Sequence, residues 1–312
     1  MISNTKVFFP NLDGFRFICF LIVFCNHSID CLGLFIDWSP KYAIIDENFF
    51  LNGDLAISFF FVLSGFLITY LLLHEKKMTG KINIKNYYVR RVLRIWPLYF
   101  LIIIITMYFI PMLSNHMPEN FPMNTSMENV NVWLYLGFLG NFSVLFNGID
   151  NVLVGVLWTV SIEEQFYLIW PLIIAFVPTK YLLKTFLALI FGSIAFRYFY
   201  AHGDFMIARF HTLSATSDLT SGALIALLAT KEMFINRIKI MPKSTIIIIY
   251  IVGFIFFPLR FFIMNPENHL VLLSSILPVV YSAFFAFIIF EQNYADNSFY
   301  KIGNNVLTIL IV

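Results

Sequence analysis

Long apolar stretches recur along the whole chain and are separated by short polar segments. An α-helix needs about 20 apolar residues to cross a bilayer, and most of these stretches approach that length. The pattern predicts an all-α fold, a polytopic transmembrane bundle of about ten segments, in which residues 1–312 form a single domain. The predicted spans are 15–36, 49–73, 95–114, 131–146, 152–178, 182–200, 217–230, 245–264 and 270–290, with an incomplete one from residue 302.

Composition strengthens the prediction of a membrane protein. Hydrophobic residues make up 60% of the chain and charged residues 12%, whereas a soluble domain carries about twice that charge. The net charge of +2 is too small to indicate a nucleic-acid partner, so membrane lipids are the expected surroundings. The N-terminal segment lacks the cleavage site of a signal peptide, and we expect the first span to stay in the mature protein.

The last apolar segment is shorter than the others. Residues 302–312 number eleven, and the sequence is still apolar at residue 312. Because a span needs about 20 residues, we expect this one to be incomplete and the domain to be truncated at its C-terminus.

Basic residues in the short loops predict the orientation of the chain. The loop from His74 to Arg94 holds seven Lys and Arg residues, and such an excess marks the cytoplasmic side. The loops 178–184 and 231–243 are also basic, and we expect them on the same side together with the N-terminus. A full crossing by 131–146 would place 178–184 outside, so 131–146 is either a crossing or a re-entrant or interfacial segment.

Two ionisable residues, Arg16 and His27, lie within the first apolar stretch. A charged side chain at membrane depth costs at least ~2.5 kcal/mol, so it normally faces a protein interior or a watery cavity and marks a functional site. Eleven residues of helix make about three turns and rise ~16 Å, so both side chains point to one face. The simpler alternatives are an Asp13–Arg16 ion pair at the helix end and a His27 that bonds a neighbouring helix.

Four sequence blocks stand out: Asp13-Gly14-x-Arg16 with His27, Gly53-Asp54-Leu55 leading to Phe59-Phe60-Phe61-Val62-Leu63-Ser64-Gly65, the arginine-rich Tyr88 to Tyr99, and Trp158-Thr159-Val160-Ser161 to Tyr167. In this order they resemble the acyltransferase-3 family of integral membrane O-acyltransferases, and together they are more specific than any one alone. Asp218-Leu219 with Gly222 is similar to a weaker, later element of the family. Thr159 and Val160 replace the Ser and Leu that are more frequent in the family, and its last span is not found in the sequence.

The resemblance implies a multi-pass enzyme of the bacterial cytoplasmic membrane. Members of the family typically move an acyl group, commonly acetyl, from cytoplasmic acyl-coenzyme A to a sugar hydroxyl of an envelope glycan. It therefore implies acyl-coenzyme A, first of all acetyl-coenzyme A, as donor substrate and a carbohydrate or lipid-linked glycan as acceptor. No tightly bound cofactor and no metal are expected, since the histidines lack metal-ligand spacing.

Candidate roles follow for the charged residues of the first three blocks. We expect His27 to be the general base for the acceptor hydroxyl, because an imidazole titrates near neutral pH. The resemblance implies that Arg16, paired with Asp13, contacts the acyl donor or polarises the transferred carbonyl. Arg91 and Arg94 are three apart on one helix face, and paired guanidiniums bind the phosphates of coenzyme A. The alternative for these two arginines is an anchor that contacts anionic lipid heads.

The fourth block supplies Glu163, which lies on one helix face with Tyr167 four residues later. We expect Glu163 to orient His27, to bind the acceptor sugar or to pair with an arginine, with Trp158 and Tyr167 beside it at the substrate. The alternative is an interhelical salt bridge to Arg16 or Arg197 that has no chemical role. Three further residues are assigned to structure: Ser64 and Gly65 to helix packing, and Asp54 to a helix cap or the mouth of the acceptor site.

A second function class fits the apolar pattern as well. A carrier or flippase for a lipid-linked saccharide or an anion would also be a polytopic bundle, although such transporters more often show internal repeats. Dependence on acyl-coenzyme A distinguishes the two classes, because only the enzyme must consume it.

Overall fold

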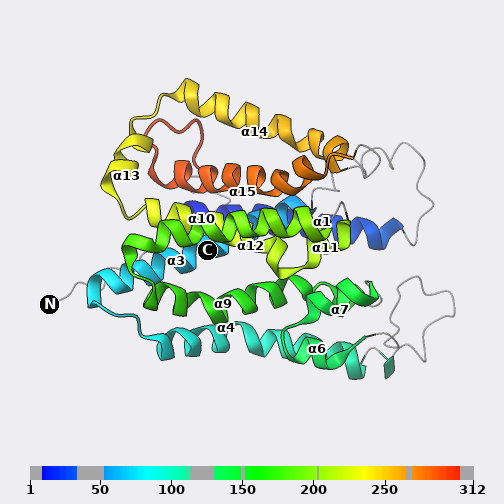
Figure 1. The fold of residues 1–312 in the computed structure, drawn as a ribbon. Helices are drawn as coiled ribbons and strands as arrows, with labels where there is room; N and C mark the ends of the chain where they lie inside the picture. The colour runs from blue at the N-terminus through cyan, green and yellow to red at the C-terminus, as the bar shows by residue number, and fades with distance from the viewer. Residues whose placement is uncertain are drawn as a thin grey trace.

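The computed structural model describes residues 9–33, 53–109, 111–112, 130–148, 152–201, 204–264 and 269–302. All regular structure in these ranges is helical, so the predicted all-α class is confirmed (Figure 1). The long helices are α1 (Pro10–Gly33), α3 (Gly53–Thr79), α4 (Ile84–Ile104), α9 (Trp158–Phe176), α10 (Thr179–Phe196), α12 (Thr212–Leu228), α14 (Lys243–Met264) and α15 (Val271–Tyr294). The short ones are α6 (Val132–Leu136), α7 (Gly140–Asn147), α8 (Val152–Gly155), α11 (Phe205–Phe210), α13 (Glu232–Lys239) and the π-helical turns η2 (Ile105–Phe109) and η3 (Arg197–Ala201).

Five described helices are long and apolar enough to cross a membrane. They are α3, α4 continued by η2, α10 continued by η3, α14 and α15; counting the pair α12 and α13, which is bent by 94°, gives six. The expected count of about ten segments is not confirmed. Helices α1 and α9 are not among these candidates, and both carry ionisable residues within the bundle.

Residues 130–148 form two short helices rather than one long helix. Helix α6 has five residues and α7 has eight, far fewer than a crossing requires. Phe138, between them, has a positive φ of 56°, which a helix does not accommodate. A continuous span over 131–146 is therefore absent from this part of the structure.

The basic turns of the chain lie together at one end of the bundle, which we call the basic end. The ammonium group of Lys76, near the end of α3, donates hydrogen bonds to the carbonyls of Ile174, Ala175 and Val177 at the end of α9. Asp296, after α15, donates its backbone N–H to the carbonyl of Lys239 in α13. The turns after α3, α9 and α13 thus share one side, to the left in Figure 1.

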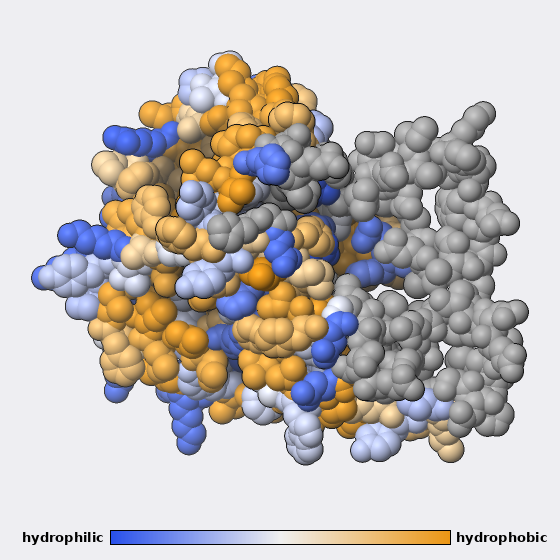
Figure 2. All heavy atoms as spheres, turned by 45° about the vertical axis from the view of Figure 1, so that its right-hand side comes forward, coloured by the Kyte–Doolittle hydropathy of each residue, from blue (hydrophilic) through white to orange (hydrophobic). Residues whose placement is uncertain are grey.

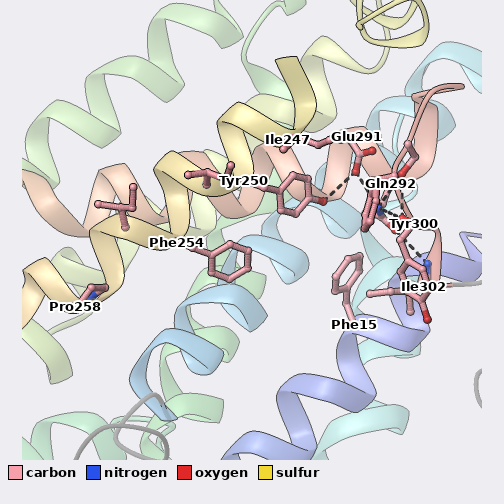
Figure 3. A pocket seen from close by; sticks show the side chains of 13 residues that line it. Phe15, Ile247, Tyr250, Phe254, Pro258, Glu291, Gln292, Tyr300 and Ile302 are labelled. Carbon is pink, nitrogen blue, oxygen red and sulfur yellow. Dashed lines mark hydrogen bonds between the residues drawn. The ribbon is translucent and has the colours of Figure 1, made fainter. Parts of the chain in front are cut away.

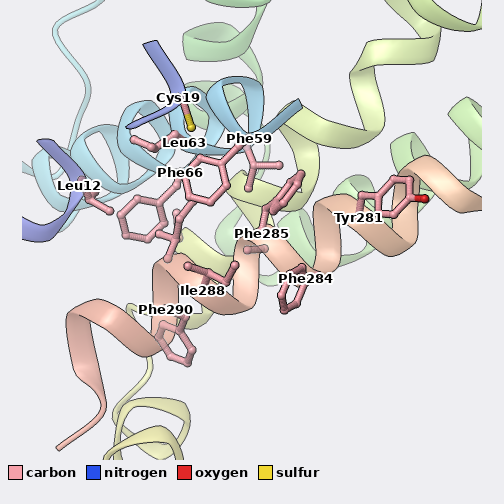
Figure 4. Close-up of a cluster of buried hydrophobic side chains, with 14 of the residues drawn as sticks. Leu12, Cys19, Phe59, Leu63, Phe66, Tyr281, Phe284, Phe285, Ile288 and Phe290 are labelled. Atoms are coloured by element: carbon pink, nitrogen blue, oxygen red, sulfur yellow. The ribbon is translucent and has the colours of Figure 1, made fainter. Parts of the chain in front are cut away.

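Helices α3 and α12 form the centre of the bundle, and they pack backbone against backbone. A Cβ atom placed on Gly65 would lie 1.8 Å from the carbonyl oxygen of Leu219, and one on Gly222 would lie 1.8 Å from that of Val62. Only glycine permits this approach. Around this contact, aromatic and aliphatic side chains of α1, α3 and α15 form a buried cluster that includes Phe59 (Figure 4).

The outward-facing surface of the helices is strongly apolar. Broad hydrophobic areas cover the face seen in Figure 2, and large side chains such as Leu93, Phe191 and Ile248 are more than half exposed. A soluble domain would bury such residues, so these faces are suited to lipid contact. The apolar helices identify a membrane protein.

Candidate functional site

A polar cluster lies inside the bundle where α1, α3, α4 and α9 meet, and it contains four of the residues predicted from the sequence. The hydroxyl of Ser64 donates a hydrogen bond of 2.6 Å to Oε1 of Glu163. The hydroxyl of Tyr167, one turn further along α9, donates to Ser64 Oγ at 3.1 Å. Arg91 and Arg16 complete this cluster, which we call the central cluster.

Arg91 points from α4 into the central cluster. Its guanidinium lies 5.1 Å from the ring centre of Tyr167 and 5.7 Å from that of Tyr87, so both rings attract the cation. It also interacts electrostatically with Glu163 and with Glu164, whose carboxylate accepts a hydrogen bond from Trp96. Arg91 is thus held between aromatic faces and two carboxylates.

Arg94 does not join Arg91 in the central cluster. The two arginines share a helix face, as predicted, but Arg94 is exposed while Arg91 is half-buried. The predicted pair is therefore divided between two environments, with Arg91 in the central cluster and Arg94 at the exposed surface of α4.

Arg16 reaches the same cluster from α1. It forms the predicted ion pair with Asp13, at 2.5 Å, and it also interacts electrostatically with Glu163. Its side chain is 39% exposed, so the pair is open to a ligand. The anchoring alternative and a substrate role are both compatible with this geometry.

His27 lies away from the central cluster. Its neighbour Asn26 packs against Gly53, at the start of α3, where a glycine Cβ would lie 2.9 Å from Asn26 Oδ1. Ser64 is eleven residues further along α3, which corresponds to ~16 Å. Within the described residues, no hydrogen bond or ion pair joins His27 to Glu163, so the expected orienting contact between them is not formed.

Trp158 also lies at the end of the bundle opposite the basic end. It begins α9, more than one turn before Glu163, and its ring lies 5.7 Å from the guanidinium of Arg209 in α11. Arg209 forms an ion pair with Asp54 in the first turn of α3. We call Asp54, Trp158 and Arg209 the opposite-end cluster.

Arg197, the other arginine considered as a partner of Glu163, is engaged elsewhere. It donates hydrogen bonds to the backbone carbonyl oxygens of Ser214, at 2.6 Å, and Ser275, at 2.8 Å. These bonds tie η3 to α12 and α15 deep inside the protein. The Glu163–Arg197 salt bridge is therefore not formed, and Arg197 has a structural role.

Sequence reasoning missed two polar residues that the structure brings into these clusters. Ser64 was assigned to helix packing, yet its hydroxyl bonds Glu163 rather than its own helix. Arg209 carried no motif, and its pairing with Asp54 depends on segments 155 residues apart. An intramembrane charge near an apolar run is the signal that could have drawn attention to Arg209.

A separate groove of about 810 Å³ lies between α14 and α1 (Figure 3). Its walls are apolar, with Phe15 on one side and Phe254 on the other, and the hydroxyl of Tyr250 donates to Glu291 Oε2 at 3.0 Å near one end. None of the predicted site residues lines it, so the groove is not part of the candidate site. Among the described residues, no group of three or more His, Cys, Asp or Glu side chains could hold a metal ion.

The fold and the two clusters define an all-helical membrane protein with charged side chains inside the bundle. A family model described as an acyltransferase domain matches residues 9–312, nearly the whole chain. The chain belongs to the acyltransferase-3 family, as the sequence blocks predicted.

Curated relatives are similar over part of their length. A Staphylococcus aureus (strain COL) protein, provisionally named an O-acetyltransferase, is 26% identical over 271 residues, covering 84% of this chain and 42% of the relative. Peptidoglycan O-acetyltransferase OatA of Listeria monocytogenes is 27% identical over 54% of this chain and 24% of the relative. O-acetyltransferase OatA of Staphylococcus aureus is 29% identical over 56% of this chain and 26% of the relative. The chain spans less than half the length of these relatives, and no solved structure matches it significantly.

Proposed function

We propose that this chain is a membrane O-acyltransferase that transfers an acyl group, acetyl as the first expectation, from cytoplasmic acyl-coenzyme A to a hydroxyl of a cell-envelope carbohydrate. One observation carries the proposal. Arg16 and Arg91 interact electrostatically with Glu163 inside an apolar bundle, and Glu163 in turn accepts a hydrogen bond from Ser64. Charges at membrane depth are costly, and membership of the acyltransferase-3 family supports a chemical role for them. The Listeria relative is named for peptidoglycan, so an envelope glycan is the first acceptor to test.

In this proposal the donor enters from the basic end, which faces the cytoplasm together with the N-terminus. The positive-inside rule supports that orientation, since the basic turns lie on one side. Arg94 holds a phosphate of coenzyme A, and the acyl-bearing arm passes Arg91 and Arg16. His27, ~16 Å further along α1, takes the proton of the acceptor hydroxyl.

Mass spectrometry of alkali-labile esters on the envelope glycan tests this function. The source strain is compared with a deletion strain and with the deletion restored by the full-length gene, wild-type or His27→Ala. Phe24→Ala, an exposed position on the same helix, is the matched control. Esters that vanish on deletion and return with wild-type and Phe24→Ala, but not with a well-inserted His27→Ala protein, support the enzyme and its base.

Two other outcomes contradict parts of the proposal. Esters restored by His27→Ala would remove His27 from the role of base. Unchanged esters on deletion, together with no consumption of acetyl-coenzyme A by membranes that contain the protein, would contradict the acyltransferase reaction and favour the transport of a saccharide or an anion.

A further inference from the structure

The opposite-end cluster lies at the level of His27 and takes no part in donor binding as proposed above. Asp54 directly follows Gly53, which packs against Asn26, the neighbour of His27. Asp54 forms an ion pair with Arg209, which comes from α11 at the same end of the bundle. A base, a carboxylate and a guanidinium therefore lie at one depth, on the side from which an acceptor glycan would approach.

The guanidinium of Arg209 is held rigidly by aromatic rings. The ring centres of Trp158, Phe205 and Phe210 lie 5.7, 5.4 and 5.3 Å from it. Trp158 is only 6% exposed, so its indole supports Arg209 and is not free to stack on a sugar. This fixes the orientation of the guanidinium fork, which is the property that recognition of a polar ligand needs.

The ion pair retains capacity for a ligand. The side chains of Arg209 and Asp54 are 27% and 33% exposed, so neither is sealed by protein. Nε of Arg209 is buried and has no hydrogen-bond partner within the described residues. A second guanidinium, that of Arg260, is 8% exposed and interacts electrostatically with both members of the pair.

A contribution to folding stability does not by itself explain the Asp54–Arg209 ion pair. A partly exposed ion pair contributes little to folding, and the desolvation of charges at membrane depth opposes it. A carboxylate that accepts hydrogen bonds from hydroxyls, beside a guanidinium that donates to oxygen atoms, is by contrast complementary to a carbohydrate.

We propose that Asp54 and Arg209 bind the acceptor carbohydrate and present one of its hydroxyls to His27. Asp54 accepts hydrogen bonds from sugar hydroxyls, and Arg209 donates to sugar oxygens. This inference rests on the proposed function, because it assigns the acceptor subsite of that reaction.

Charge reversal separates ligand binding from a structural ion pair. The full-length gene carrying both Asp54→Arg and Arg209→Asp keeps an opposite-charge pair, and Arg209→Lys keeps the charge while removing the planar fork. Arg237→Lys, exposed on α13, is the matched control. Each variant is restored to the deletion strain, and protein level, thermal unfolding, binding of coenzyme A to the purified protein and esters on the envelope glycan are measured.

We expect the reversed pair and Arg209→Lys to insert and to bind coenzyme A like the wild type, while esters fall by about tenfold or more in both. Arg237→Lys should leave the esters unchanged. Wild-type ester levels in the reversed pair would overturn the inference, because only the attraction between the two charges would then matter. If the reversed pair fails to fold, Arg209→Lys alone decides, and normal esters with it overturn the inference. A wild-type chain that binds coenzyme A but makes no esters overturns the subsite together with the acceptor of the proposed function.

Discussion

Ser64 on α3 and Glu163 on α9 are joined by a hydrogen bond of 2.6 Å in the interior of the bundle. Helical serines commonly bond the carbonyl of the preceding turn, as Ser161 does to Leu157. Ser64 instead donates to a residue of another helix and accepts a hydrogen bond from the hydroxyl of Tyr167. This hydroxyl therefore links α3 to two residues of α9.

Replacement of that hydroxyl should be costly. Ser64→Ala removes the Ser64 donor from Oε1 of the part-buried Glu163, and the loss of a hydrogen-bond partner by a charged acceptor costs up to about 1–3 kcal/mol. We expect a lower thermal unfolding temperature and fewer glycan esters. Ser274→Ala is the control, since the hydroxyl of Ser274 donates to the nearby carbonyl of Val271 in its own helix. A Ser64→Ala protein as stable and active as Ser274→Ala would show that the contact is dispensable.

The division of Arg91 from Arg94 predicts different kinetic effects. Acetyl-coenzyme A and acetyl-pantetheine, which lacks the phosphates, are compared as donors by release of the free thiol. Arg94→Gln should raise KM about tenfold for acetyl-coenzyme A only, because a charged hydrogen bond to phosphate is lost. Arg91→Gln should lower kcat/KM for both donors, since it removes the cation from the central cluster. An Arg91→Gln effect confined to acetyl-coenzyme A would instead place a phosphate at Arg91.

The close contact of α3 and α12 makes two glycines irreplaceable. Gly65→Ala and Gly222→Ala each place a Cβ 1.8 Å from a backbone oxygen, so the helices must separate. Overpacking of a tight core typically costs about 1–3 kcal/mol or more, and here the obstacle is backbone. We expect little folded protein in the membrane for either variant. Gly192→Ala, which meets nothing within 4 Å, should insert and unfold like the wild type.

Lys76 stabilises the end of α9 through three carbonyl groups. A cation at a helix C-terminus satisfies free carbonyls and interacts with the helix dipole, each effect worth about 0.3–1 kcal/mol. Lys76→Ala should therefore lower the free energy of unfolding, and exposed Lys77→Ala should not. Equal unfolding temperatures for the two variants would contradict this role of Lys76.

His211 predicts a pH dependence of stability. Nδ1 of His211 accepts a hydrogen bond of 3.1 Å from the N–H of Leu213 and caps α12, so the folded state needs neutral imidazole. Burial lowers the pKa of His211 below its ordinary value of 6.5. The unfolded chain therefore takes up a proton first, and the contribution of His211, present above pH 6.5, is lost as the pH falls below that value.

Substitution by another capping residue isolates this effect. His211→Asn keeps an N-cap acceptor but cannot titrate, so its unfolding temperature should fall less than that of the wild type between about pH 7 and pH 5. The two proteins are compared by thermal unfolding at each pH. Parallel curves would assign the pH dependence to other groups.

Much of the helical architecture could be predicted from hydrophobic runs, because length and apolarity determine whether a helix can span a bilayer. For the region 131–146 the sequence left a crossing and a re-entrant or interfacial segment as alternatives, because the break at Phe138 depends on local backbone conformation and on packing against α9. The Asp13–Arg16 ion pair was predictable because helical spacing alone sets it.

Contacts between distant helices were not predictable in the same way. Periodicity placed Glu163 and Tyr167 on one face, but nothing in a single sequence indicates that Ser64 lies opposite them. Spacing along α9 also separates Trp158 from Glu163, and their shared block in the sequence concealed that Trp158 lies in the opposite-end cluster and Glu163 in the central cluster. The partner of each charge depends on the register between helices, which the sequence does not encode locally.

The backbone contact between α3 and α12 also limits how the protein can move. Gly65 and Gly222 leave no gap through which one helix could slide or rock against the other without first pulling apart. Helix α3 carries both Asp54 and Ser64, so one helix holds the two polar clusters at a constant separation. A carrier that alternates between inward-open and outward-open states by moving α3 against α12 would have to break this contact. In the proposed reaction, the acyl group would therefore move between two clusters that one helix holds at a fixed distance.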